Sequence, residues 1–92
     1  MNDAMIRRHL SGTRVLLLDI IDAEDTPDRE QLVLRWLKRR PAVSERVAAR
    51  VPQMIDQLLW EVENLEWVKR VGARYSLTAL GERARGFARA DR

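Results

Sequence analysis

The sequence MIDQLLWEVENLEWVKRVGARYSLT, which spans residues 54–78, decides the fold class of this chain. Its first half carries apolar side chains at helical spacing, which places them on one face of a helix. These side chains are Ile55, Leu58, Leu59, Val62 and Leu65. Its second half holds two short β-prone runs, 67–71 and 74–78, on either side of a turn that contains Gly72. The pattern predicts a long amphipathic helix that leads directly into a β-hairpin.

Another helix is predicted over residues 28–40, and both of its ends are marked. Thr26 can cap its N-terminus, and Pro27 suits the first helical position because a proline there loses no hydrogen bond. Pro41 ends the helix, since a proline inside a helix removes a backbone hydrogen bond. This segment is the first helix of a predicted helix-turn-helix.

Two further helices complete that motif, which spans residues 28–65. Ser44 can cap a short helix over residues 44–50, because its hydroxyl can accept a hydrogen bond from the first turn. Pro52 then marks a turn before the third helix, over residues 53–65. That third helix takes the place of a recognition helix.

The end of the hairpin resembles a known family. Residues 75–81 read Tyr-Ser-Leu-Thr-Ala-Leu-Gly, which is similar to the wing of winged helix-turn-helix transcription regulators of the MarR and PadR kind. In that family the recognition helix leads into a wing that ends Y-S-L-T-x-x-G. The resemblance extends back to Pro27. It implies a mainly α fold with a small β-hairpin, a winged helix-turn-helix, and a transcription regulator that binds double-stranded DNA.

A chain of 92 residues forms one small domain, for which dimerisation would help to bury apolar surface. We expect a flexible N-terminal arm over residues 1–12 and a single winged-helix domain over residues 13–92. Within the domain we expect an N-terminal helix over 13–24, for which a buried strand is the alternative, a wing over 66–78 and a C-terminal helix over 79–90. A homodimer through the N-terminal and C-terminal helices is expected.

The chain offers no constellation that an enzyme would need. It has no cysteine, and therefore no disulfide or thiol chemistry, which fits a reducing compartment. His9 is the single histidine and has no evident partner, so we interpret it as an incidental surface residue. No glycine-rich phosphate-binding motif is present. We expect a protein that is not an enzyme and has no catalytic residues, metal ligands or cofactors.

The apolar runs are too short for a membrane span. The longest, residues 15–18, ends at Asp19, whereas about 20 apolar residues are needed to cross a bilayer. Residues 10–14 also interrupt any apolar core of a secretion signal. We therefore expect no membrane anchor and a cytoplasmic location.

The charges of the chain occur in blocks, although the formal net charge is only +3. Residues 35–50 hold six bases and one acid, and residues 69–92 hold seven bases and two acids. The predicted recognition helix lies between these two basic blocks. Such a distribution suits a protein whose lysines and arginines neutralise the phosphates of DNA.

The candidate DNA contacts follow from this geometry. A recognition helix offers its N-terminal side chains to base edges, and Gln53 and Gln57 are the base-contact candidates because glutamine can pair bidentately with adenine. Basic residues on the preceding helix and on the wing are the phosphate candidates. The full candidate set is Ser44, Arg46, Arg50, Gln53, Met54, Gln57, Lys69, Arg70 and Arg74.

The third predicted helix also supports an alternative. It carries Asp56, Glu61 and Glu63 but no lysine or arginine, so phosphates would repel it. A winged-helix module could instead bind another protein through this acidic helix, with Asp56, Trp60 and Glu61 at the interface. The direction of Trp60 stays open between rim packing and a contact surface, whereas Trp36 is assigned to the core.

Overall fold

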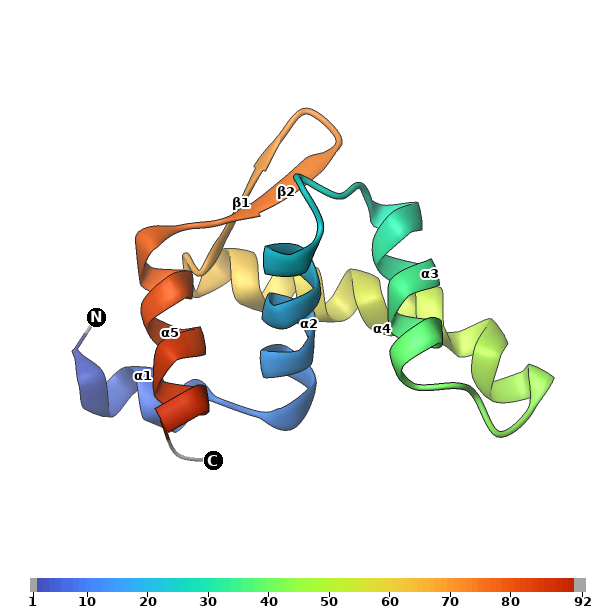
Figure 1. Cartoon of the computed structure of the whole chain (residues 1–92), viewed down its shortest axis with the longest axis horizontal. Coiled ribbons are helices and arrows are strands. Elements are labelled where there is room, and N and C mark those ends of the chain that lie inside the picture. The colour runs from blue at the N-terminus through green and yellow to red at the C-terminus, as the bar shows by residue number, and fades with distance from the viewer. Residues whose placement is uncertain (1, 91–92) are drawn as a thin grey trace.

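The computed structural model describes residues 2–90 and is mainly helical, with one two-stranded antiparallel hairpin (Figure 1). Residue 1 of the predicted arm and residues 91–92 of the predicted domain lie outside the described residues. In chain order the elements are α1 (Asp3–His9), α2 (Gly12–Ala23), α3 (Arg29–Arg39), α4 (Glu45–Asn64), β1 (Val68–Val71), β2 (Arg74–Leu77) and α5 (Ala79–Ala90). The predicted class, mainly α with a small hairpin, is confirmed.

Helix α2 lies at the centre of the molecule and packs against α3, α4, α5 and β2. Helices α1 and α5 pack together on one side of α2, and α3 lies on the other side. Helix α4 packs against α3, passes behind α2 and leads into the hairpin, which stands above the helices (Figure 1). The most deeply buried side chains of the core include Ile6, Leu17, Leu18, Leu32, Ile55, Val62 and Trp67. One apolar core therefore joins every helix to the base of the hairpin.

Helix α3 begins later than the sequence predicts. Its N-cap is Asp28, whose carboxylate accepts the N–H of Gln31 at 2.9 Å while the Gln31 side chain accepts the N–H of Asp28 at 2.9 Å. This reciprocal capping box satisfies two donors that would otherwise lack partners. Thr26 and Pro27 lie before the helix, and the carbonyl of Pro27 accepts the N–H of Tyr75 at 2.9 Å. The expected cap is thus replaced by a contact between the loop and β2.

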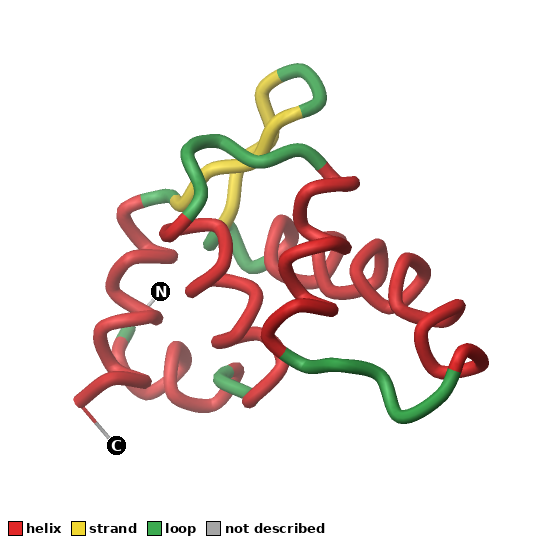
Figure 2. The backbone as a smooth tube through the Cα atoms, turned by 45° about the vertical axis from the view of Figure 1, so that its right-hand side comes forward, coloured by secondary structure: helices red, strands yellow, loops and turns green. Residues whose placement is uncertain are grey.

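The prediction of two helices separated by a turn at Pro52 is wrong. Helix α4 runs from Glu45 to Asn64, with Pro52 as its eighth residue. A proline removes one hydrogen bond from the helical ladder, but the buried stripe of α4 continues on both sides of it. That stripe consists of Val51, Ile55, Leu58, Leu59 and Val62. Burial of this stripe against α2 and α3 outweighs the lost hydrogen bond, so one continuous helix follows the loop after α3 (Figure 2).

The ends of α4 are both closed by local hydrogen bonds. Ser44 caps the N-terminus as predicted, and its hydroxyl accepts the N–H of Val47 at 3.2 Å. At the C-terminus Glu66 adopts a left-handed φ of 63°, and Trp67 donates its backbone N–H to the carbonyl of Val62 at 2.9 Å. This arrangement is a Schellman motif, which turns the chain sharply at the end of a helix. It explains how α4 leads into β1 without a linker.

The N-terminal segment also differs from the predicted flexible arm. Residues 3–9 form α1, which Asn2 caps by accepting the N–H of Met5 at 2.9 Å. The side chain of Ile6 is 0% exposed and belongs to the core, and the guanidinium of Arg7 lies 5.1 Å from the ring centroid of Phe87 in α5. Ile6 and Leu10 lie one helical turn apart and both pack on the core, but a stripe of two residues is too short for periodicity to predict a helix.

The remaining elements lie close to their predicted positions. Helix α2 begins one residue earlier than expected and is not a strand. The hairpin pairs Val68 with Leu77 and Val71 with Arg74, and Gly72 takes a left-handed φ of 64° in its turn. Helix α5 has the bounds expected for the C-terminal helix.

Candidate nucleic-acid interface

The side of α4 that points away from the core carries one continuous row of exposed residues. They recur at intervals of four and three, which keeps them on one face of a helix. We call this row the outer face of α4, and it consists of Arg46, Arg50, Gln53, Gln57, Trp60 and Asn64. The row contains two cations and no anion. It exists as one surface only because α4 continues through Pro52.

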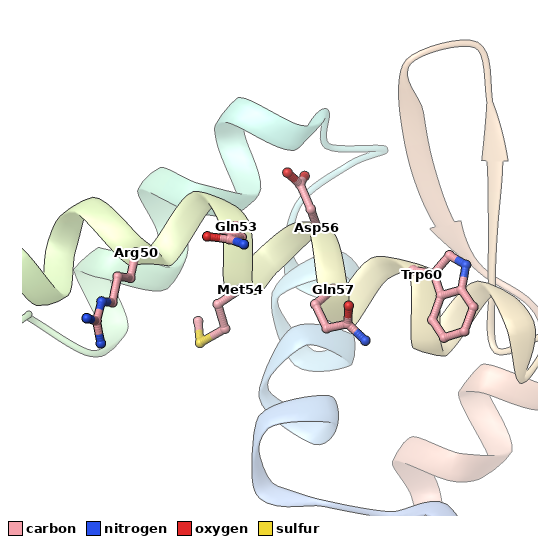
Figure 3. Close-up of a pocket in the computed structure, with 6 residues that line it drawn as sticks. All are labelled: Arg50, Gln53, Met54, Asp56, Gln57 and Trp60. Atoms are coloured by element: carbon pink, nitrogen blue, oxygen red, sulfur yellow. The ribbon is translucent and has the colours of Figure 1, made fainter.

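An open hollow of about 580 Å³ lies along the middle of this face. Its lining comes from α4 alone and is formed by Arg50, Gln53, Met54, Asp56, Gln57 and Trp60 (Figure 3). Asp56 projects from one edge of the helix, whereas Met54 and Gln57 project from the other (Figure 3). Trp60 is 62% exposed, so most of its side chain lies on the surface of the described chain.

Asp56 forms an ion pair with an arginine from α3. Its two carboxylate oxygens accept hydrogen bonds from Nε of Arg29 at 2.5 Å and from Nη2 at 2.9 Å. The hydrogen bond from Arg29 and its positive charge lower the pKa of Asp56. The carboxylate therefore stays ionised, but its charge is balanced at the edge of the outer face.

Glu61 forms a similar ion pair with an arginine from α2. Its Oε1 accepts a hydrogen bond from Nε of Arg14 at 3.0 Å, and its Oε2 accepts one from Nε2 of Gln57 at 3.1 Å. The hydrogen bond from Gln57 and the contact with Arg14 lower the pKa of Glu61. Two of the three acids that opposed DNA binding in the sequence are thus paired with arginines of neighbouring helices.

The cations of the outer face differ from these paired arginines. Arg46 and Arg50 are exposed and form no ion pair within residues 2–90. They lie in the N-terminal half of α4, one turn apart. The described side chains therefore leave both of them available to an anionic ligand.

The hairpin carries the second basic group. Lys69 and Arg70 are exposed on β1 and form no ion pair in the described part of the chain. Arg74 has a different environment, because its Nη1 donates to the carbonyl of Thr26 at 2.9 Å. Its backbone also forms an isolated antiparallel bridge with Asp28. Arg74 thus holds the loop before α3 against β2.

The predicted site residues therefore fall into three groups. Arg50, Gln53, Met54 and Gln57 line one hollow, and Arg46 lies on the same face. Lys69 and Arg70 belong to the hairpin, which follows the opposite end of α4 (Figure 1). The remaining two, Ser44 and Arg74, make structural hydrogen bonds. Sequence reasoning missed Arg14 and Arg29, because they are 47 and 27 residues away from their acidic partners and no local pattern links them.

No group of three or more histidine, cysteine, aspartate or glutamate side chains among residues 2–90 could hold a metal ion. No described helix combines the length and apolar character that a membrane crossing requires.

Comparisons of the chain with protein-family models, with curated proteins and with solved structures found no match.

Proposed function

We propose that this chain is a winged-helix protein that binds double-stranded DNA as a transcriptional regulator. The outer face of α4 would enter the major groove, and the hairpin would serve as the wing. The observation that carries the proposal is the charge of that face, on which two unpaired arginines and two glutamines lie while Asp56 and Glu61 are neutralised at its edges. The element order supports it, because two packed helices joined by a short loop lead directly into a hairpin.

The length and shape of α4 suit this role. An α-helix fits the major groove of B-DNA, and a helix of 20 residues is about 30 Å long at 1.5 Å per residue. Gln53 is the ninth residue of α4, so base contacts would come from the middle of the helix rather than from its N-terminus. Arg46 and Arg50 would contact phosphates on the N-terminal side, and Lys69 and Arg70 would contact them from the hairpin.

The proposal includes a homodimer. A chain of this size has a modest core, and two copies related by twofold symmetry would bind a pseudo-palindromic site. Sedimentation equilibrium of the purified protein should give twice the mass of the chain. A monomer at the concentrations that bind DNA would remove this part of the proposal.

A second candidate function rests on Trp60. An exposed tryptophan in an open hollow is typical of the centre of a protein interface. In that case α4 would bind a partner protein, and Asp56 and Glu61 would flank the contact. Salt separates the two functions, since DNA binding weakens steeply with ionic strength and an apolar contact does not.

The deciding experiment is fluorescence anisotropy of a labelled random-sequence duplex at low and at moderate salt. The parent protein should bind at low salt and release the duplex as salt is added. The variant Arg46→Ala/Arg50→Ala should bind more weakly. The slope of log affinity against log salt concentration should be smaller in magnitude by about two, because about one counterion fewer is released for each phosphate contact that is lost.

The control variant is Arg7→Ala/Arg8→Ala, which removes the same charge from exposed positions of α1, outside the helices expected to form the dimer. It should bind like the parent. Equal weakening by both double variants would show that only net charge matters, and absence of binding by the parent at low salt would refute the DNA proposal.

A further inference from the structure

Three side chains from α2 and α4 form a hydrogen-bonded chain that ends on the outer face of α4. Arg14 binds Oε1 of Glu61 at 3.0 Å, and Gln57 binds Oε2 of the same carboxylate at 3.1 Å. We propose that Gln57 is the residue that reads adenine and that Glu61 and Arg14 are positioning residues, which hold the Gln57 amide in its reading orientation. This inference rests on the proposed DNA-binding function.

The chemistry of the carboxylate determines which end of the amide faces it. An ionised carboxylate only accepts hydrogen bonds, so Glu61 orients the amide nitrogen of Gln57 toward itself. The amide nitrogen has two hydrogens, and this contact uses one of them. The second hydrogen and the carbonyl oxygen of Gln57 remain for a ligand. Adenine presents the matching pair in the major groove, because N7 accepts and the N6 amino group donates.

The carboxylate is itself held from the far side. Arg14 lies in the first turn of α2, where its backbone N–H donates to the hydroxyl of Ser11 at 3.2 Å, and its Nη1 donates to the carbonyl of His9 at 2.7 Å. The side chains of Arg14 and Glu61 are only 23% and 25% exposed. Both oxygens of Glu61 are therefore engaged, and its position is determined by packing and by hydrogen bonds from two directions.

Gln53 provides an internal comparison on the same face. It lies one turn before Gln57, is exposed, and makes no side-chain hydrogen bond within the described residues. A free glutamine loses rotamer entropy when it contacts a base, whereas an oriented one has lost much of it already. We therefore expect Gln57 to discriminate between base pairs and Gln53 to contribute less.

The test needs a preferred duplex, which is selected from a random pool with the parent protein. Affinities are then measured for that duplex and for variants in which one base pair at a time is changed. Replacing one particular A·T pair should lower the affinity of the parent protein for the duplex by about tenfold, as expected for the loss of a bidentate contact. Gln57→Ala should abolish the preference at that pair alone. Glu61→Ala should reduce the preference at the same pair without weakening binding to random duplex.

Glu63→Ala is the matched control for Glu61→Ala. It removes the same charge from α4, and Glu63 makes no side-chain hydrogen bond or ion pair in the described region. It should keep the preference of the parent. An unchanged preference in Glu61→Ala, or an equal loss in Glu63→Ala, would overturn the positioning role while leaving DNA binding intact. Absence of duplex binding by the parent would instead refute the proposed function.

A measurement without DNA tests the hydrogen-bonded chain separately. In the free protein the side-chain amide of Gln57 should show a higher ¹⁵N heteronuclear NOE than that of Gln53, because Glu61 restrains it. Glu61→Ala should lower the value for Gln57 to that of Gln53. Equal values in the parent would overturn the inference, and the folded spectrum of the variant would show that it retains the native structure.

Discussion

Helix α5 passes so close to the backbone of Trp67, the residue before β1, that only glycine fits at one position. A Cβ atom built on Gly81 would lie 1.9 Å from the carbonyl oxygen of Trp67 and 2.9 Å from its carbonyl carbon. Real Cβ atoms are essentially never found closer than 3.0 Å to another heavy atom, so Gly81→Ala requires a displacement of at least about 1.1 Å, the difference between these two distances.

That displacement must separate two backbones rather than move a flexible side chain. The carbonyl of Trp67 accepts the N–H of Thr78 at 3.0 Å, and the hydroxyl of Thr78 accepts the N–H of Gly81 at 3.0 Å. The shift therefore strains the cap of α5 as well as the packing of its first turn. Overpacking of a well-packed site costs about 1–3 kcal/mol, and backbone contacts place this substitution at the upper end or beyond. We expect Gly81→Ala to destabilise the protein by about 3 kcal/mol.

Gly86→Ala is the matched control, because it lies in the same helix and its added Cβ meets no atom within 4 Å. There the usual preference of helices for alanine should apply, with a gain of about 0.5–1 kcal/mol. The two substitutions are chemically identical and should change the free energy of unfolding in opposite directions. Urea denaturation followed by circular dichroism measures both. If Gly81→Ala were as stable as the parent, the close approach of α5 to Trp67 would be wrong.

Three further predictions concern the core, the proline and one ion pair. Ile6→Ala should lower the free energy of unfolding, measured by thermal denaturation, by about 2–5 kcal/mol because Ile6 is fully buried. Met5→Ala, at a 44% exposed position, should change it by only a few tenths of a kcal/mol. Similar effects of the two substitutions would contradict the docking of α1. Pro52→Ala should raise the urea midpoint and stabilise α4 by about 1–3 kcal/mol, since proline is unfavourable inside a helix, and a loss of stability would argue against a continuous α4. Asp56→Asn removes a carboxylate whose pKa is lowered by the hydrogen bond from Arg29, so the parent should be more stable at neutral pH, by less than about 1 kcal/mol because the pair is half exposed. This advantage is present above the ordinary aspartate pKa and should disappear as the pH falls through the lowered value, so a difference that does not change with pH would contradict the pair.

Strong local patterns made much of the fold predictable. The apolar stripe from Ile55 to Val62 and the β-prone runs around Gly72 correspond to α4 and to the hairpin, and Ser44 caps α4 as its side-chain chemistry predicts. Trp36 is buried, as its helical spacing predicts. These features depend on residues within a few positions of one another, so periodicity and capping rules are sufficient to find them.

Other features had no local signal or a misleading one. Pro52 is a strong breaker in sequence terms, yet burial on both sides of it keeps α4 continuous, and that continuity places Arg46 and Arg50 on the same face as Gln53. Ile6 and Leu10 form an apolar stripe of only two residues, which predicts no helix, yet both dock on the core from the N-terminal segment. In each case packing over a long sequence distance outweighs a local preference.

The sequence by itself determined most of the helices, the position of the hairpin, the lack of cysteine and the presence of the two glutamines proposed for base contacts. The tertiary structure alone decided the charge of the surface that carries those glutamines. In the sequence α4 is an acidic helix, but Arg29 and Arg14 reach Asp56 and Glu61 from other helices and leave a face whose unpaired charges are positive. The physical reason is that the interaction of two charges depends on their distance in space, and the fold brings these partners to within about 3 Å across gaps of 27 and 47 residues.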